Sequence, residues 1–67
     1  MKKFYFTWGY GQKFRDKSMA NHYTIITAKD DVEARQKMID RFGTEWGFQY
    51  NTAEAAGVNK WRLIYFP

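Results

Sequence analysis

The sequence predicts an α+β fold: a small antiparallel sheet of about four strands with one amphipathic helix packed on one face. Segments in which aromatic and β-branched residues alternate with other residues have the period of strands. One segment between them carries both a helix start signal and a helix end signal. The predicted order is strand, strand, helix, strand, short helix, strand, and 67 residues are expected to form a single compact domain, residues 1–67.

The first two strands are predicted from alternating rings and from β-branched residues. Four rings occupy every second position of residues 3–10, namely Phe4, Phe6, Trp8 and Tyr10. Alternate residues of a strand share a face, so these rings are predicted to lie together. Residues 11–21 show no periodicity and are predicted to form a loop, and long loops of small domains are often functional. Residues 22–28 are predicted to be the returning strand.

The helix is predicted over residues 31–42. Asp30 stands at the N-cap position with Glu33 three residues later, and Gly43 can take the left-handed conformation that often ends a helix. At 100° per residue one stripe collects the apolar side chains together with one arginine. The members of this stripe are Val32, Arg35, Met38, Ile39 and Phe42.

Three further elements complete the prediction. Residues 46–50 return to period two, with three rings on one face: Trp46, Phe48 and Tyr50. Asn51 followed by Glu54 predicts one or two helical turns, which Gly57 closes. Residues 60–66 are predicted to form the last strand. The pattern leaves the order of the strands open: the crossover through the helix could make the second and third strands parallel neighbours, or could place the third strand against the first.

Composition excludes several classes of protein. The 6 Phe, 5 Tyr and 3 Trp residues supply apolar area that disordered chains lack. Without Cys the chain can form neither a disulfide framework nor a thiolate zinc site. No apolar run has the length of a membrane span or the form of a signal peptide. A cytoplasmic protein that does not contact the membrane is therefore expected.

The formal charge of +4 is concentrated near the start of the chain. Residues 1–17 contain five cations and one acid, whereas the cations and acids of residues 18–67 balance. A localised basic patch attracts anionic partners such as nucleic acid, a nucleotide or an acidic protein surface. The alternative is that this charge simply keeps a ring-rich domain in solution.

Few residues have the character of catalytic groups. His22 is the only histidine and is expected at the surface, and no Ser or Cys has an evident activating partner. Asp30 and Asp31 are explained by helix capping. Gly9 and Gly11 form a G-x-G without the third glycine of a dinucleotide site. The sequence therefore predicts no enzyme activity, no metal site and no cofactor.

The segment from residue 8 to residue 17 is the strongest candidate for a binding site, because it combines rings, cations and amide donors near two glycines. Its candidate partner-binding residues are Tyr10, Gln12, Lys13, Phe14, Arg15 and Lys17. Single-stranded nucleic-acid binders and protein interface hot spots both use these residue types. The alternative is that Trp8 and Tyr10 are core rings and that Phe14 holds the loop down.

Arg35 is a separate candidate because a guanidinium in an apolar stripe needs solvent or buried acceptors. One interpretation is a bond to backbone carbonyls, a Tyr hydroxyl or an acid near the first strand. The functional alternative is a small-anion site between helix and sheet, with Arg35 at its floor.

Three parts of the sequence resemble a group of small phage and prophage proteins of unassigned function. That group shares approximately Y-F-T-F-G, A-R-x-x-M and F-G-x-x-W-x-F-x-Y, and the corresponding segments are residues 4–9, 34–38 and 42–50. This chain has Trp8 where Phe is usual, and a more basic loop. The resemblance implies a phage setting, in which small accessory proteins often bind host or defence machinery, anti-CRISPR proteins among them.

These observations lead to one main functional hypothesis and two alternatives. The main hypothesis is a non-enzymatic phage-type protein that binds and blocks or modulates a bacterial host or defence protein. The alternatives are a small basic nucleic-acid-binding module and a protein that sequesters a nucleotide or small anion. A homodimer is also expected, because one helix can hardly cover so many rings.

Overall fold

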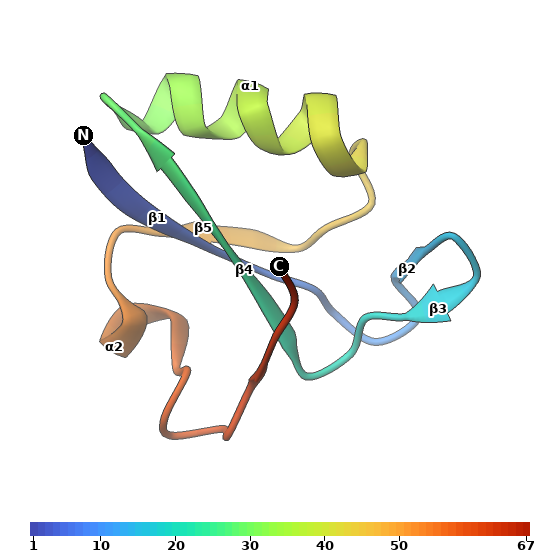
Figure 1. Cartoon of the computed structure of the whole chain (residues 1–67). Coiled ribbons are helices and arrows are strands. Elements are labelled where there is room, and N and C mark those ends of the chain that lie inside the picture. Colours follow the sequence, from blue (N-terminus) through green and yellow to red (C-terminus); the bar gives the residue numbers. More distant parts are fainter.

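A four-stranded sheet with one helix across one face forms the centre of the computed structural model, which describes residues 1–67 (Figure 1). The strands lie in the order β5-β1-β4-β6. Their bounds are Lys2–Thr7 for β1, His22–Ala28 for β4, Phe48–Tyr50 for β5 and Ile64–Tyr65 for β6. The α+β class and the element order predicted for the main sheet are confirmed.

The sheet is mixed, whereas the sequence predicted an antiparallel one. β1 is antiparallel to both β4 and β5, but β6 is parallel to β4. β5 and β6 consequently run in the same direction, and parallel strands need a crossover connection. Residues 51–63 make this crossover on the side of the sheet away from α1, where the short helix α2 lies (Figure 1). Alternation along a strand carries no signal of its direction, which is why the parallel pair was not foreseen.

The predicted loop contains a small hairpin. Strands β2 (Lys13–Phe14) and β3 (Lys17–Ser18) pair with each other in a separate two-stranded sheet. The two residues between them, Arg15 and Asp16, have φ angles of 50° and 66°. Two successive positive φ angles are typical of a type I′ turn, which suits the twist of a hairpin. The turn lacks the usual Asn-Gly pair, so no residue pattern predicts a hairpin there.

Helix α1 spans Asp31–Phe42, as predicted. The Asp30 carboxylate accepts a hydrogen bond from the Glu33 N–H at 2.8 Å, and the Glu33 carboxylate accepts one from the Lys29 N–H at 3.0 Å. Gly43 ends the helix with a φ of 78°, and its N–H donates to the Ile39 carbonyl. Both predicted end signals therefore act on the backbone.

The face of α1 that packs on the sheet differs from the predicted stripe. Ala34, Met38 and Phe42, which are spaced four residues apart, are buried. Val32 was predicted inside but is 73% exposed. The small Ala34 side chain is fully buried and lets the helix approach the sheet closely. The buried face of the helix is therefore centred on the side of Ala34 and not on the side of Val32.

The core lies between α1 and the sheet. The inward residues of β1 and β4 meet the helix, and Trp8 and Phe6 make edge-to-face contacts with Phe42 and Trp46 at ring distances of 5.6 and 5.0 Å. Phe48 and Tyr50, predicted to share a face with Trp46, lie on the opposite side of the sheet. The register places them beside Thr7 and Tyr5, which alternate with the inward Phe6.

The last quarter of the chain contains less regular structure than predicted. Helix α2 spans Ala53–Ala56, and its N-cap is Thr52 rather than Asn51, because the Thr52 hydroxyl accepts from the Ala55 N–H at 3.0 Å. Gly57 closes the helix in the left-handed conformation, as predicted. The predicted strand over residues 60–66 pairs only in β6, because turns occupy the residues before it. Neither helix has the length and apolar character needed to cross a membrane.

Candidate functional site

The hairpin of β2 and β3 presents three cations at the surface: Lys13, Arg15 and Lys17. We call this group the basic hairpin. All three residues are exposed, and none forms an ion pair, since the only ion pair of the chain joins Lys37 and Glu33 at 3.5 Å. Asp16 in the turn is the only acid within the hairpin. The basic hairpin therefore keeps a net positive charge that no ion pair neutralises, and this charge is available to an anionic partner.

Two other residues predicted to bind a partner hold the hairpin in place. The Phe14 ring packs against the core, with ring centroids 4.9 Å from Phe42 and 6.1 Å from Phe66. The Gln12 side-chain oxygen accepts a hydrogen bond from the Gly9 N–H, and the Gln12 carbonyl accepts from the Met19 N–H at 3.0 Å. Phe14 and Gln12 thus hold the base of the hairpin, and each remains partly exposed.

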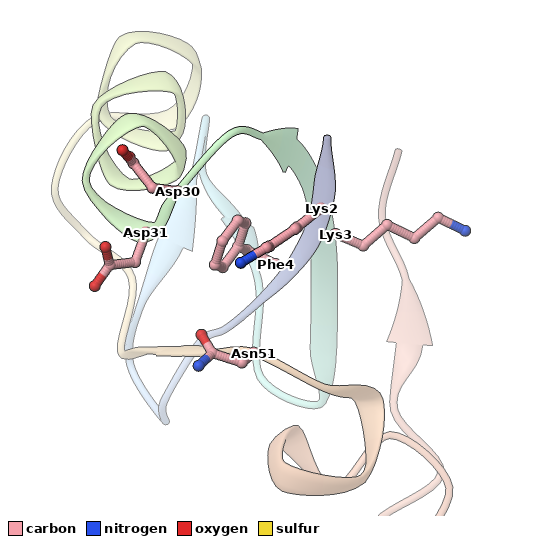
Figure 2. Close-up of a pocket in the computed structure, with 6 residues that line it drawn as sticks. All are labelled: Lys2, Lys3, Phe4, Asp30, Asp31 and Asn51. Atoms are coloured by element: carbon pink, nitrogen blue, oxygen red, sulfur yellow. The ribbon is translucent and has the colours of Figure 1, made fainter.

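The positive charge of residues 1–17 is divided between two places. Lys2 and Lys3 lie on β1 near the N-terminus, and the basic hairpin lies beyond the other end of that strand (Figure 1). Figure 2 shows the Lys2 side chain directed into a hollow of about 290 Å³ beside Asp31 and Asn51, while Lys3 points to the opposite side of the strand. The single basic patch expected from the sequence is therefore not formed.

Tyr10 belongs to a second feature, a cavity of about 410 Å³ on the side of the sheet away from α1. Its walls come from the end of β1, from β5 and from the crossover over residues 51–63. Six of its lining residues are Thr7, Tyr10, Asn21, Tyr50, Trp61 and Leu63. We call it the aromatic cavity. Tyr10 was the only one of these six among the predicted site residues.

Sequence reasoning missed the other walls for a topological reason. Trp61 was predicted in a regular strand, but it lies in a turn next to α2, where its ring covers Gly57. Asn21 has a φ of 64°, and its carbonyl accepts a hydrogen bond from the Ile64 N–H at 2.7 Å. The cavity exists because the crossover brings residues 56–63 against β1 and β5. Such a long-range contact cannot be predicted from the pattern of neighbouring residues.

A row of four tyrosines crosses the same side of the sheet, with one ring from each strand. Ring distances are 6.4 Å between Tyr5 and Tyr23 and 5.5 Å between Tyr23 and Tyr65, and Tyr50 is paired with Tyr5. None of these hydroxyls forms a hydrogen bond within the chain. This surface is apolar in area but carries free polar groups, which is typical of binding surfaces.

Arg35 does not lie at the floor of a site between helix and sheet. It is exposed on α1, lines none of the three cavities, and its guanidinium lies 5.3 Å from the centroid of the Trp46 ring. Stacking on a half-buried ring explains how an arginine fits an apolar stripe. Trp46 was not foreseen as the partner because its segment was assigned wholly to a strand.

The titratable groups form no cluster with evident chemistry. His22 is half-buried, with its Nδ1 atom 2.9 Å from the Ala20 carbonyl, and no charged residue bonds to it. No group of three or more His, Cys, Asp or Glu residues lies close enough together to hold a metal ion. The two distinctive groups of side chains are the cations on the hairpin and the rings in the aromatic cavity.

Comparison with protein-family models, with curated proteins and with solved structures gives no match for this chain.

Proposed function

We propose that this chain is a non-enzymatic binding protein that attaches to an acidic surface of a bacterial host or defence protein and blocks or modulates it. The basic hairpin is its contact surface. The observation that carries the proposal is that three exposed cations on a core-anchored hairpin have no ion-pair partner in the chain. Such charges increase the rate of association with an acidic surface at little cost in reorganisation.

The anchoring of the hairpin supports this function further. The packing of Phe14 against the core and the Gln12 bonds fix the base of the hairpin, so its cations are held in position before a partner arrives. Preorganised contacts bind more tightly because less conformational entropy is lost on association. The phage setting implied by the sequence resemblance fits a small protein of this kind acting in the host cytoplasm.

The test starts with capture of partners from nuclease-treated bacterial lysate and their identification by mass spectrometry. The affinity of the purified partner is then measured for the wild type and for the K13E/R15E/K17E variant. A matched variant, K2E/K29E/R41E, makes the same change in charge at exposed positions off the hairpin. The proposal predicts that the affinity for the partner falls at least tenfold in the hairpin variant and less than threefold in the matched variant. Equal affinities for a folded hairpin variant would refute it.

The same cations make nucleic acid the second candidate partner. Release of counterions from about three phosphate contacts gives a slope of log K against log salt near −3 on duplex DNA. Oligonucleotide binding with this slope, abolished by K13E/R15E/K17E, would favour nucleic acid over protein. Absence of binding at low salt would remove this candidate.

A further inference from the structure

We propose that the aromatic cavity binds a nucleobase. This site is distinct from the basic hairpin, and the ligand class is a planar heteroaromatic ring attached to a phosphate, as in a nucleotide. The inference does not depend on the proposed function, because none of the residues that line the aromatic cavity belongs to the basic hairpin.

The walls of the cavity match the faces of a base. Tyr10, Tyr50 and Trp61 line it together, and a base stacks on such rings whatever its identity. The volume of about 410 Å³ falls in the range of small-molecule sites. Tyr10 is 92% exposed and Trp61 is 65% exposed, so both rings are free to pack on a ligand. Burial in the core does not explain the position of Tyr10 and Trp61, because most of each side chain is in solvent.

The edge of a base also finds partners in the cavity. Thr7 and Asn21 line it, and neither side chain forms a hydrogen bond within the chain. An Asn amide offers two donors and an acceptor, and a Thr hydroxyl offers a donor and acceptors. These groups suit the mixed donors and acceptors along the edge of a nucleobase, whereas a purely hydrocarbon ligand would leave them without partners.

Charge beside the cavity fits the phosphate. Lys60 and Arg62 flank Trp61 in sequence, both are exposed, and the Lys60 ammonium lies 5.2 Å from the centroid of the Trp61 ring. Neither forms an ion pair in the chain. No acidic residue lines the aromatic cavity. The Lys60 ammonium therefore lies near the ring on which a base would stack.

The experiment is calorimetric titration of the full chain with AMP, GMP, CMP and UMP, with ribose 5-phosphate as the ligand that lacks a base. We expect at least one nucleotide to bind, and ribose 5-phosphate to bind at least tenfold more weakly. A second set of titrations uses single-stranded oligonucleotides of ten dA or ten dT nucleotides. Binding of mononucleotides identifies a free nucleotide as the source of the base, and binding of oligonucleotides alone identifies a single strand.

Variants connect any binding to this cavity. Tyr10→Ala and Trp61→Ala should each weaken binding at least tenfold, whereas Val32→Ala, which truncates an exposed apolar side chain on α1 outside the cavity, should change it less than twofold. Tyr10 is so exposed that its removal leaves the fold intact, which circular dichroism checks. No binding at millimolar ligand, or equal binding by Tyr10→Ala and the wild type, would overturn the inference. Loss of binding only in K13E/R15E/K17E would also overturn it and assign the ligand to the hairpin.

Discussion

Gly57 cannot be replaced without cost for two reasons, its backbone conformation and its contact with Trp61. Its φ is 77°, and a Cβ atom added there would lie 2.4 Å from Cδ1 of Trp61. We expect Gly57→Ala to lower the free energy of unfolding by about 2 to 3 kcal/mol, because it adds backbone strain and displaces the indole ring. Urea unfolding followed by circular dichroism measures the change.

Gly11→Ala is the matched control. Gly11 has nearly the same φ, 80°, but a Cβ atom there would meet nothing within 4 Å. The control should therefore show only the cost of the left-handed backbone, about 1 kcal/mol. Equal losses in the two variants would show that Trp61 does not rest on Gly57, and the wall it forms in the aromatic cavity would then be in doubt.

Glu33 provides a prediction about pH at the start of α1. The hydrogen bond from the Lys29 N–H, with Lys37 nearby, lowers the pKa of Glu33 below its ordinary value of 4.5. A group with a lowered pKa in the folded state stabilises above its unfolded pKa, and this contribution is lost as the pH falls through the folded pKa. We therefore expect the unfolding free energies of the wild type and Glu33→Gln to converge below pH 4.5, as measured by urea unfolding between pH 7 and pH 2.5.

A direct measurement separates the two causes of this shift. In Lys37→Met the backbone bond to Glu33 remains, so the pKa of Glu33 measured by NMR titration should rise but stay below the ordinary value. A pKa at the ordinary value in the wild type would contradict the capping geometry.

At the scale of elements, Phe14 determines whether the hairpin stays on the domain. Its ring packs on Phe42 and Phe66 and is half-buried, so Phe14→Ala should lower the free energy of unfolding by about 2 kcal/mol, less than for a fully buried ring. Tyr10→Ala, in the adjoining turn, should change it by less than about 0.5 kcal/mol. Thermal unfolding compares the two, and the opposite ranking would mean that Phe14 is a contact residue after all.

The elements that could be predicted are those with local signals. Asp30, Glu33 and Gly43 bounded α1 correctly because capping bonds are made within a few residues. Phe48 and Tyr50 were placed on the wrong face because their orientation is set by pairing with β1, more than forty residues away. The aromatic cavity was not foreseen for the same reason: Tyr10 and Trp61 become its walls only through the crossover. The cations of the hairpin could thus be predicted from the residue pattern, whereas the rings of the aromatic cavity are brought together only by the topology.

At the scale of the whole molecule, the sheet has two edge strands, β5 and β6, and β5 is the longer of them. β5 pairs only with β1, so its outer side is a free edge, and Phe48 on that strand is 67% exposed. Free edges invite pairing with another strand, and a two-fold axis would place two β5 strands side by side in antiparallel orientation. Such pairing would cover both Phe48 rings, and it gives the homodimer expected from the sequence a definite interface.

We therefore expect sedimentation velocity to show a dimer whose fraction increases between about 10 and 500 μM, since a small interface of this kind binds weakly. Phe48→Lys should shift the protein to monomer, because it places two cations against each other across the axis. Val32→Lys adds the same charge at an equally exposed apolar residue on α1 and should leave the dimer unchanged. A monomer at every concentration, or equal effects of the two substitutions, would exclude β5 as the interface.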